Sequence, residues 1–156
     1  MRHTMIVLLA AALALAACGA TAPSGGSASA NGITISGAWA RPSAAAMAEG
    51  GMAEGGMGNG AAYMVISNSA AQPDRLVAAA GDVAGAIELH TVENKDGVMA
   101  MRPVDGVDVP AGGQVELKPG SFHVMMIGLT RELKPGDRIP LTLRFQNAGD
   151  VRVEAE

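Results

Sequence analysis

Short runs of alternating or wholly apolar residues recur along most of this chain, and turn residues separate them. Such runs are typical of β-strands, and they cover Ile33–Trp39, Ala61–Ser67, Arg75–Ala80, Ala86–Glu93, Val98–Val104, Gln114–Leu117, Phe122–Leu129, Ile139–Gln146 and Val151–Glu154. No run has the 3.6-residue period of a long amphipathic helix. Many short strands at this spacing predict an all-β protein, a single-domain β-sandwich or Greek-key barrel, with Trp39 and Tyr63 in its core.

The first residues have the features of a cleaved lipoprotein signal. Arg2 precedes an apolar run from Met5 to Ala17, which is shorter than the roughly 20 residues that a membrane-spanning helix needs. Cys18, the one cysteine of the sequence, follows at the expected cleavage position. We therefore expect a signal peptide over 1–17, lipidation of Cys18 and a periplasmic protein anchored to the inner or outer membrane of a Gram-negative bacterium. The alternative is an ordinary secretory leader with an incidental cysteine.

Two segments lack a strand pattern. Residues 18–32 are rich in Gly, Ala and Ser and are expected to be a flexible tether, so that the folded domain covers 33–154. Within 46–59 a five-residue repeat carries three methionines, Met47, Met52 and Met57. A spacing of five matches neither the strand period nor the helix period, so we expect a mobile, exposed loop insertion there.

Charge and cysteine content exclude several classes of function. The chain has 11 basic and 15 acidic residues and a formal net charge of −4, which argues against a nucleic-acid partner because phosphate binding needs clustered Lys and Arg. With only Cys18, the folded part can form no internal disulfide and no thiolate metal site.

Two histidines and two methionines are the candidate metal ligands. Once His3 is removed with the leader, His90 and His123 are the remaining histidines. His123 and Met125 are two residues apart, so on a strand they share one face. His90 and Met101 flank a hairpin, and a two- or four-residue loop centred between residues 95 and 96 would place them directly opposite each other. A three-residue bulged loop would instead separate their faces.

Two imidazoles and two thioethers form a neutral, soft ligand set that suits Cu(I) better than Zn²⁺ or hard cations. Each residue also has an ordinary structural interpretation. A histidine on a strand is often a hydrogen-bonded core or surface residue, and Met125 beside Met126 could fill a gap between sheets.

The spacing of these four residues resembles the signature of the periplasmic copper chaperones called PCu(A)C. Ten residues separate His90 from Met101, twenty-one separate Met101 from His123, and one separates His123 from Met125. Similar segments extend over Ile33 to Glu154 and include Glu88-Leu-His90, Val98-Met-Ala-Met-Arg-Pro-Val104 and His123-Val-Met-Met-Ile-Gly-Leu129. The resemblance implies a cupredoxin-like β-sandwich that binds one Cu(I) through the four residues. It further implies delivery to the copper-site subunit of cytochrome c oxidase or to another copper chaperone.

Other functions remain as alternatives. A copper storage or resistance protein would use the same site, whereas a structural β-sandwich lipoprotein would bind no metal. A blue-copper carrier needs a Cys ligand. An enzyme needs an open coordination site with acid–base groups, and no such constellation is evident, so we expect no catalysis. The repeat methionines Met47, Met52 and Met57 could hold an additional Cu(I), or the repeat could be a tolerated low-complexity insertion.

Overall fold

A computed structural model describes residues 26–41, 58–95 and 97–156 of the chain. Cys18 and the repeat methionines Met47, Met52 and Met57 lie outside these described residues. Within them every regular element is a strand, and no described helix is long and apolar enough to cross a bilayer. The strands are β1 (Gly26–Ala30), β2 (Ile33–Ala40), β3 (Gly60–Asn68), β4 (Asp74–Ala80), β5 (Ala84–Lys95), β6 (Val98–Pro103), β7 (Val107–Val109), β8 (Gln114–Leu117), β9 (His123–Leu129), β10 (Ile139–Phe145) and β11 (Gly149–Ala155).

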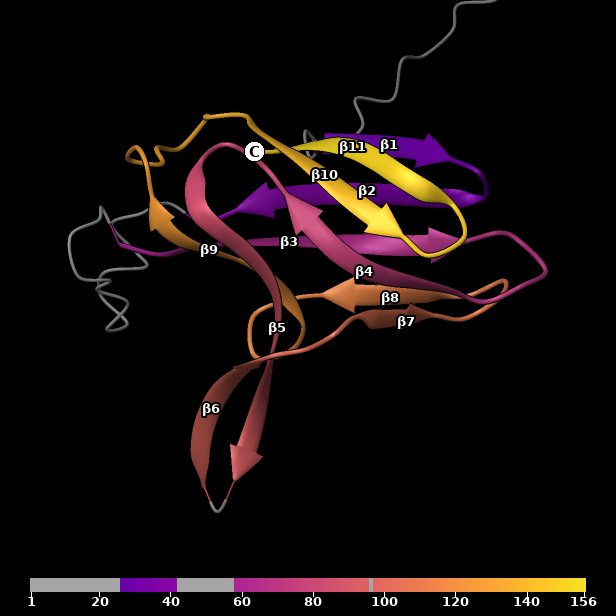
Figure 1. Cartoon of the computed structure of the whole chain (residues 1–156), viewed down its shortest axis with the longest axis horizontal. Helices are drawn as coiled ribbons and strands as arrows, with labels where there is room; N and C mark the ends of the chain where they lie inside the picture. The colour runs from indigo at the N-terminus through magenta and orange to yellow at the C-terminus, as the bar shows by residue number, and fades with distance from the viewer. Residues whose placement is uncertain (1–25, 42–57, 96) are drawn as a thin grey trace, which may run out of the picture.

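The strands form two sheets that pack as a sandwich (Figure 1). The larger sheet has the order β1-β2-β3-β9-β5-β6, and the smaller has the order β11-β10-β4-β7. Strands β8 and β9 share one edge of β3: β9 pairs with its first residues and β8 with its last. The predicted all-β sandwich is confirmed.

The core lies between the sheets because side chains alternate between the two faces of each strand. On β10, Leu141, Leu143 and Phe145 are buried, and on β9, Val124 and Met126 are fully buried in the same cluster. The other face of β9 therefore points away from the core.

The tether expected over residues 18–32 ends earlier than predicted, since Gly26–Ala30 forms strand β1 and pairs with β2. Residues 18–25 lie outside the described part of the chain. The two are joined by Asn31 and Gly32, both with positive φ (49° and 85°). Asn-Gly is the preferred sequence of a two-residue hairpin turn that needs positive φ at both positions. The small side chains of β1 give no alternating hydrophobic pattern, so the periodicity did not predict this strand. The Asn31-Gly32 turn is the sequence signal that indicates it.

Two expected boundaries also shift by a few residues. Gly58 and Asn59, assigned to the insertion 46–59, bind strand β9: Leu129 N–H donates to the Gly58 carbonyl and Gly128 N–H to Asn59 Oδ1. At the other end, Glu156 exchanges backbone hydrogen bonds with Ala38 and Ala40 of β2 and so joins the two sheets along one side.

The β5–β6 hairpin extends beyond the sandwich (Figure 1), and its register corrects the expected opposition of His90 and Met101. Lys95 pairs with Val98, so the hairpin pairing is centred one residue later than expected. His90 consequently faces Pro103, and Met101 faces Val92. A shift of two in the pairing preserves the face, so Met101 remains a diagonal neighbour of His90 on one side of the hairpin.

Asp74, at the start of β4, fastens the β10–β11 turn. Its carboxylate accepts the backbone N–H groups of Arg75, Asn147 and Ala148 at 2.7, 2.9 and 2.9 Å. Burial by itself would raise the pKa of the Asp74 carboxyl, but the hydrogen bonds from Asn147, Arg75 and Ala148 outweigh it and hold that pKa below its ordinary value.

We expect Asp74→Asn to lower the free energy of unfolding at pH 7 by about 2 kcal/mol, because charge-assisted hydrogen bonds are lost from a buried site. Since the folded-state pKa lies below the unfolded one, this stabilisation is present above about pH 4 and is lost as the pH falls through the folded-state pKa. Urea unfolding of both proteins at pH 7 and at lower pH measures the difference.

The exposed Asp108, which pairs with Arg75, provides the matched control. Asp108→Asn should cost less than about 1 kcal/mol because the ion pair is solvated. Equal losses for Asp74→Asn and Asp108→Asn would contradict the anchoring role of Asp74.

Candidate metal centre

A row of rings crosses the outer face of the larger sheet. Trp39 on β2 pairs with Tyr63 on β3, and His123 on β9 pairs with His90 on β5. Ring centroids are 4.5 Å apart for Trp39–Tyr63, 6.2 Å for Tyr63–His123 and 5.8 Å for His90–His123. The expected core position of Trp39 is wrong: it is 41% exposed, and it shelters Tyr63 from outside the sandwich.

The histidines come together because β9 lies between β3 and β5. The prediction that His123 and Met125 share one face of β9 is confirmed. The alternate residues Val124 and Met126 point to the other face, into the core. Sequence reasoning did not predict that His123 would lie directly opposite His90. These residues are brought together by long-range strand pairing, which local spacing does not reveal.

Hydrogen bonds assign the proton on each imidazole. His90 Nε2 is 2.8 Å from Glu88 Oε2, and His123 Nδ1 is 3.0 Å from the Ser121 carbonyl. A carboxylate and a carbonyl can only accept, so a neutral His90 carries its proton on Nε2 and a neutral His123 carries its proton on Nδ1. The free lone pairs are therefore on His90 Nδ1 and His123 Nε2.

Among the described residues, His90 Nδ1 is the buried side-chain nitrogen or oxygen that lacks a hydrogen-bond partner. An unsatisfied buried polar atom is costly and requires an explanation. A metal ion bound at this nitrogen would supply one, and Glu88 behind the ring is the carboxylate partner that ligand histidines commonly have. Sequence reasoning missed this role, although the period of two places Glu88 on the same face as His90.

Burial lowers the pKa of His123, and the nearby His90 and Arg41 lower it further, whereas the Ser121 carbonyl opposes them. His123 therefore stays neutral to a lower pH than an exposed histidine. Only the neutral imidazole offers a lone pair to a metal ion.

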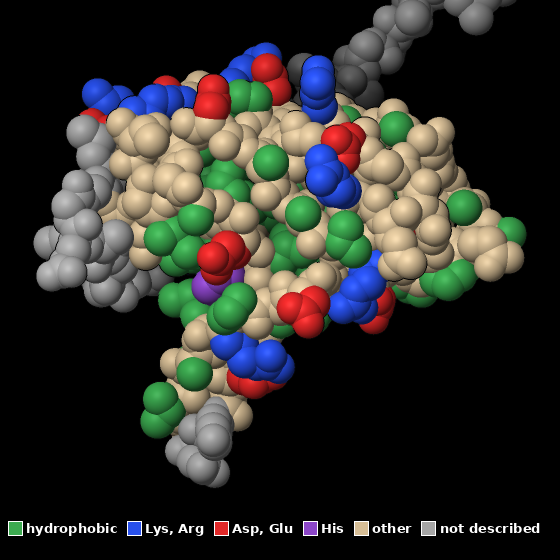
Figure 2. Space-filling view, viewed as in Figure 1, with side chains coloured by type: hydrophobic (Ala, Val, Ile, Leu, Met, Phe, Trp, Pro, Cys, Tyr) green, Lys and Arg blue, Asp and Glu red, His purple; other side chains and the backbone are tan. Residues whose placement is uncertain are grey.

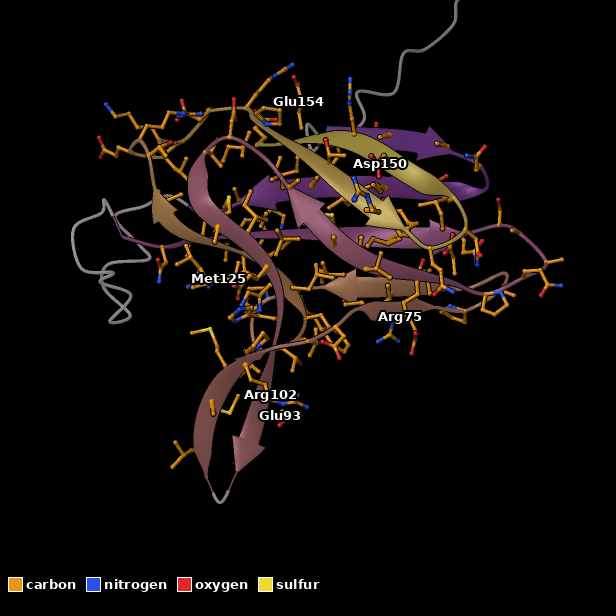
Figure 3. The ribbon with its side chains drawn as sticks, viewed as in Figure 1. Arg75, Glu93, Arg102, Met125, Asp150 and Glu154 are labelled. Carbon is orange, nitrogen blue, oxygen red and sulfur yellow. The ribbon has the colours of Figure 1, made fainter. Side chains whose placement is uncertain are left out.

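The thioethers surround a cavity of about 280 Å³ on the same face. Its lining includes His123, Met125, Met101 and Met99. The side chains range from His123 (4% exposed) and half-buried Met125 to Met101 (60% exposed). Met125 lies near the base of the projecting hairpin (Figure 3), and a histidine is visible there among hydrophobic side chains in Figure 2.

The structure thus brings His90, Met101, His123 and Met125 to one face, and their role as ligands stays a prediction. His90 does not line the cavity itself, and its ring lies beside that of His123. In the described part of the chain no cluster of three or more His, Cys, Asp or Glu residues could hold a metal. A site at this place consequently depends on thioether donors.

Comparison with known proteins identifies relatives across this whole domain. A family model described as "Putative lipoprotein LpqE-like" matches residues 33–156. "Putative lipoprotein Lxx21020" of Leifsonia xyli subsp. xyli is 29% identical over 119 residues, which are 76% of this chain and 64% of that protein. "Uncharacterized protein RP573" of Rickettsia prowazekii is 33% identical over 90 residues, which are 57% and 50% of the respective chains. The chain thus spans between half and two thirds of the length of these curated relatives.

Solved structures share the fold. A copper-bound PCuAC domain from PmoF2 aligns over 83% of this chain and 94% of that domain, with a TM-score of 0.63 and 24% identity. Apo-DR1885 from Deinococcus radiodurans aligns over 99% and 94%, with a TM-score of 0.55 and 29% identity. CuI-DR1885 aligns over 62% and 65%, with a TM-score of 0.52 and 35% identity. The fold is the cupredoxin-like β-sandwich of PCuAC domains, as the sequence resemblance implied.

We expect the metal-free protein at neutral pH to contain His90 as the Nε2–H tautomer and His123 as the Nδ1–H tautomer, because each proton donates to a fixed acceptor. Long-range ¹H–¹⁵N correlation spectra of the imidazole rings distinguish the two forms. A dominant Nδ1–H form of His90 would contradict the assignment. In Glu88→Leu, which removes the acceptor, the preference of His90 should weaken while that of His123 remains.

Proposed function

This chain belongs to the LpqE-like lipoprotein family, and we propose that it is a copper-binding chaperone that holds Cu(I) through His90, Met101, His123 and Met125. The observation that carries the proposal is the unpartnered, buried His90 Nδ1, which lies in a ring next to His123. Copper-bound PCuAC domains with this fold support it.

The donor atoms suit Cu(I) for chemical reasons. Two neutral imidazoles and two thioethers leave the charge of the ion unchanged and are soft, whereas Zn²⁺ and hard cations prefer thiolate, carboxylate or carbonyl ligands. Copper remains cargo in this proposal. The bound form is Cu(I) throughout, and the protein binds and releases it without catalysing a reaction.

The graded exposure of the donors favours a chaperone over a storage protein. His123 is almost fully buried, Met125 is half-buried and Met101 is largely exposed. An ion held by the buried His123, the partly buried His90 and an exposed thioether is both protected and accessible to an acceptor. A storage protein has no need of the exposed side, and a structural lipoprotein would leave the unsatisfied His90 nitrogen unexplained.

We place the protein in the cell envelope, anchored by lipid on Cys18 and facing the periplasm. The lipoprotein family and the lipoprotein relative support the anchor. The proposed recipient is the copper-site subunit of a respiratory oxidase or another copper chaperone, and it rests on the PCu(A)C resemblance.

The repeat methionines Met47, Met52 and Met57 are proposed to bind a second Cu(I), since three thioethers are soft donors. Arg41, the last described residue before that segment, and Asn59, the second described residue after Met57, both line the cavity. The chain therefore enters and leaves the segment with the repeat methionines close to the proposed copper site.

We expect Met125→Leu to weaken Cu(I) binding by at least about tenfold and His123→Ala by at least about 100-fold. Loss of a residue that only hydrogen-bonds to a ligand typically lowers metal affinity by about 10–100-fold, and loss of a ligand itself should lower it at least as much. Competition titration against a colorimetric Cu(I) chelator measures both. Met126→Leu is the matched control: it removes the adjacent thioether from the core with little change of volume and should leave affinity unchanged.

Equal affinity of the parent and His123→Ala would overturn the site, and absence of selective Cu(I) binding by the parent would favour the structural alternative. Delivery is tested by mixing the loaded protein with the apo copper domain of an oxidase and following the metal by NMR. Failure of the parent to transfer, despite tight binding, would favour storage.

For the repeat, we expect the parent to bind two Cu(I) ions and the Met47/Met52/Met57→Ala variant to bind one, because the variant keeps only the His–Met site. Native mass spectrometry and copper analysis give the stoichiometry. Identical stoichiometry and affinity in the two proteins would show that the repeat has no metal role.

A further inference from the structure

The described methionines fall into two groups. Met64 and Met126 are at most 2% exposed and belong to the core. The other three, Met99, Met101 and Met125, all line the cavity beside His123. Every described thioether that is not used for core packing therefore lies at the proposed copper site, and Met99 has so far been given no function.

Met99 is not explained by packing. All six residues of β6 are exposed, and Met99 is 58% exposed, although burial of such a side chain would stabilise the fold by roughly 1.5–3 kcal/mol. Its cross-strand partner is Asn94, whose side chain accepts the Gly97 N–H instead.

The β5–β6 hairpin has two chemically different faces. Met99 and Met101 are two residues apart and share the face that borders the cavity. The opposite face carries the Glu93–Arg102 ion pair (Figure 3). Both thioethers thus lie on the side of the proposed metal ion. A hairpin without a role in metal binding would not need this arrangement.

Met99 lies on the outer side of Met101. It is two residues nearer the tip of the hairpin, roughly 7 Å farther along the strand. The proposed donors therefore form a series that begins at the buried His123 and the partly buried His90, continues through Met125 and Met101, and ends at Met99.

We propose that Met99 is an exchange ligand, which binds Cu(I) briefly as the ion enters or leaves and is not part of the resident set. This inference rests on the proposed copper function. On release, a bond between the Met99 sulfur and Cu(I) forms as a resident ligand bond breaks, and the acceptor's thioether or thiolate then replaces Met99. The copper remains Cu(I) and no electron is transferred. Entry follows the same steps in reverse.

An exchange ligand changes the rate of transfer in both directions and leaves the equilibrium nearly unchanged. For Met99→Leu, which conserves volume, we expect Cu(I) transfer to a chromogenic chelator to slow by about tenfold, the effect of a barrier raised by about 1.4 kcal/mol. The equilibrium affinity should stay within about threefold of the parent. Stopped-flow absorbance and competition titration give the two quantities.

The neighbouring exposed Val98 provides the matched control. Val98→Met combined with Met99→Leu restores the number of thioethers but puts the new one on the face with Glu93 and Arg102, so transfer should remain slow. Recovery of the parent rate in that variant would overturn the proposal, because the position of the sulfur would not matter.

Three further outcomes separate this inference from the proposed function. A parent that binds no Cu(I) refutes both. A parent that binds Cu(I), with Met99→Leu transferring at the parent rate, refutes only the exchange role. An affinity loss in Met99→Leu as large as in Met101→Leu also refutes it, because Met99 would then be a resident ligand.

Discussion

The pairing of β9 with β5 is the interaction on which both the core and the candidate site depend. In this register His123 faces His90 on the outside, while Val124 faces Leu89 in the core. A slip of one residue would turn His123 into the core and expose Val124. The burial of β9 between two neighbouring strands therefore holds the histidines opposite each other, and the same hydrophobic contacts that stabilise the sandwich keep the site assembled.

In the proposed copper site, one nitrogen of each histidine is free in the metal-free protein. Glu88 and the Ser121 carbonyl hold one proton on each imidazole and leave the other nitrogen free. Burial around His123 favours its neutral form. The unsatisfied His90 Nδ1 lowers the stability of the metal-free protein. Binding of a cation at this nitrogen would remove that loss of stability.

The hairpin of β5 and β6 separates the stability of the protein from its chemistry. No residue of β6 belongs to the core, and each is exposed. A change in the position of the β6 methionines would therefore not disturb the packing between the sheets. In the proposed copper site, His90, His123 and Met125 therefore lie on strands β5 and β9 that contribute to the core, whereas Met101 lies on the exposed strand β6.

Local periodicity was sufficient to predict the sandwich, the shared face of His123 and Met125 and, through spacing, the family resemblance. The same period of two could have found Glu88 and Met99, and the Asn31-Gly32 turn could have found β1. The opposition of His90 and His123, the outward place of Trp39 and the unpartnered His90 Nδ1 were decided only by the tertiary structure. They depend on pairing between strands remote in sequence and on burial by the whole fold, and neither is encoded in the spacing of neighbouring residues.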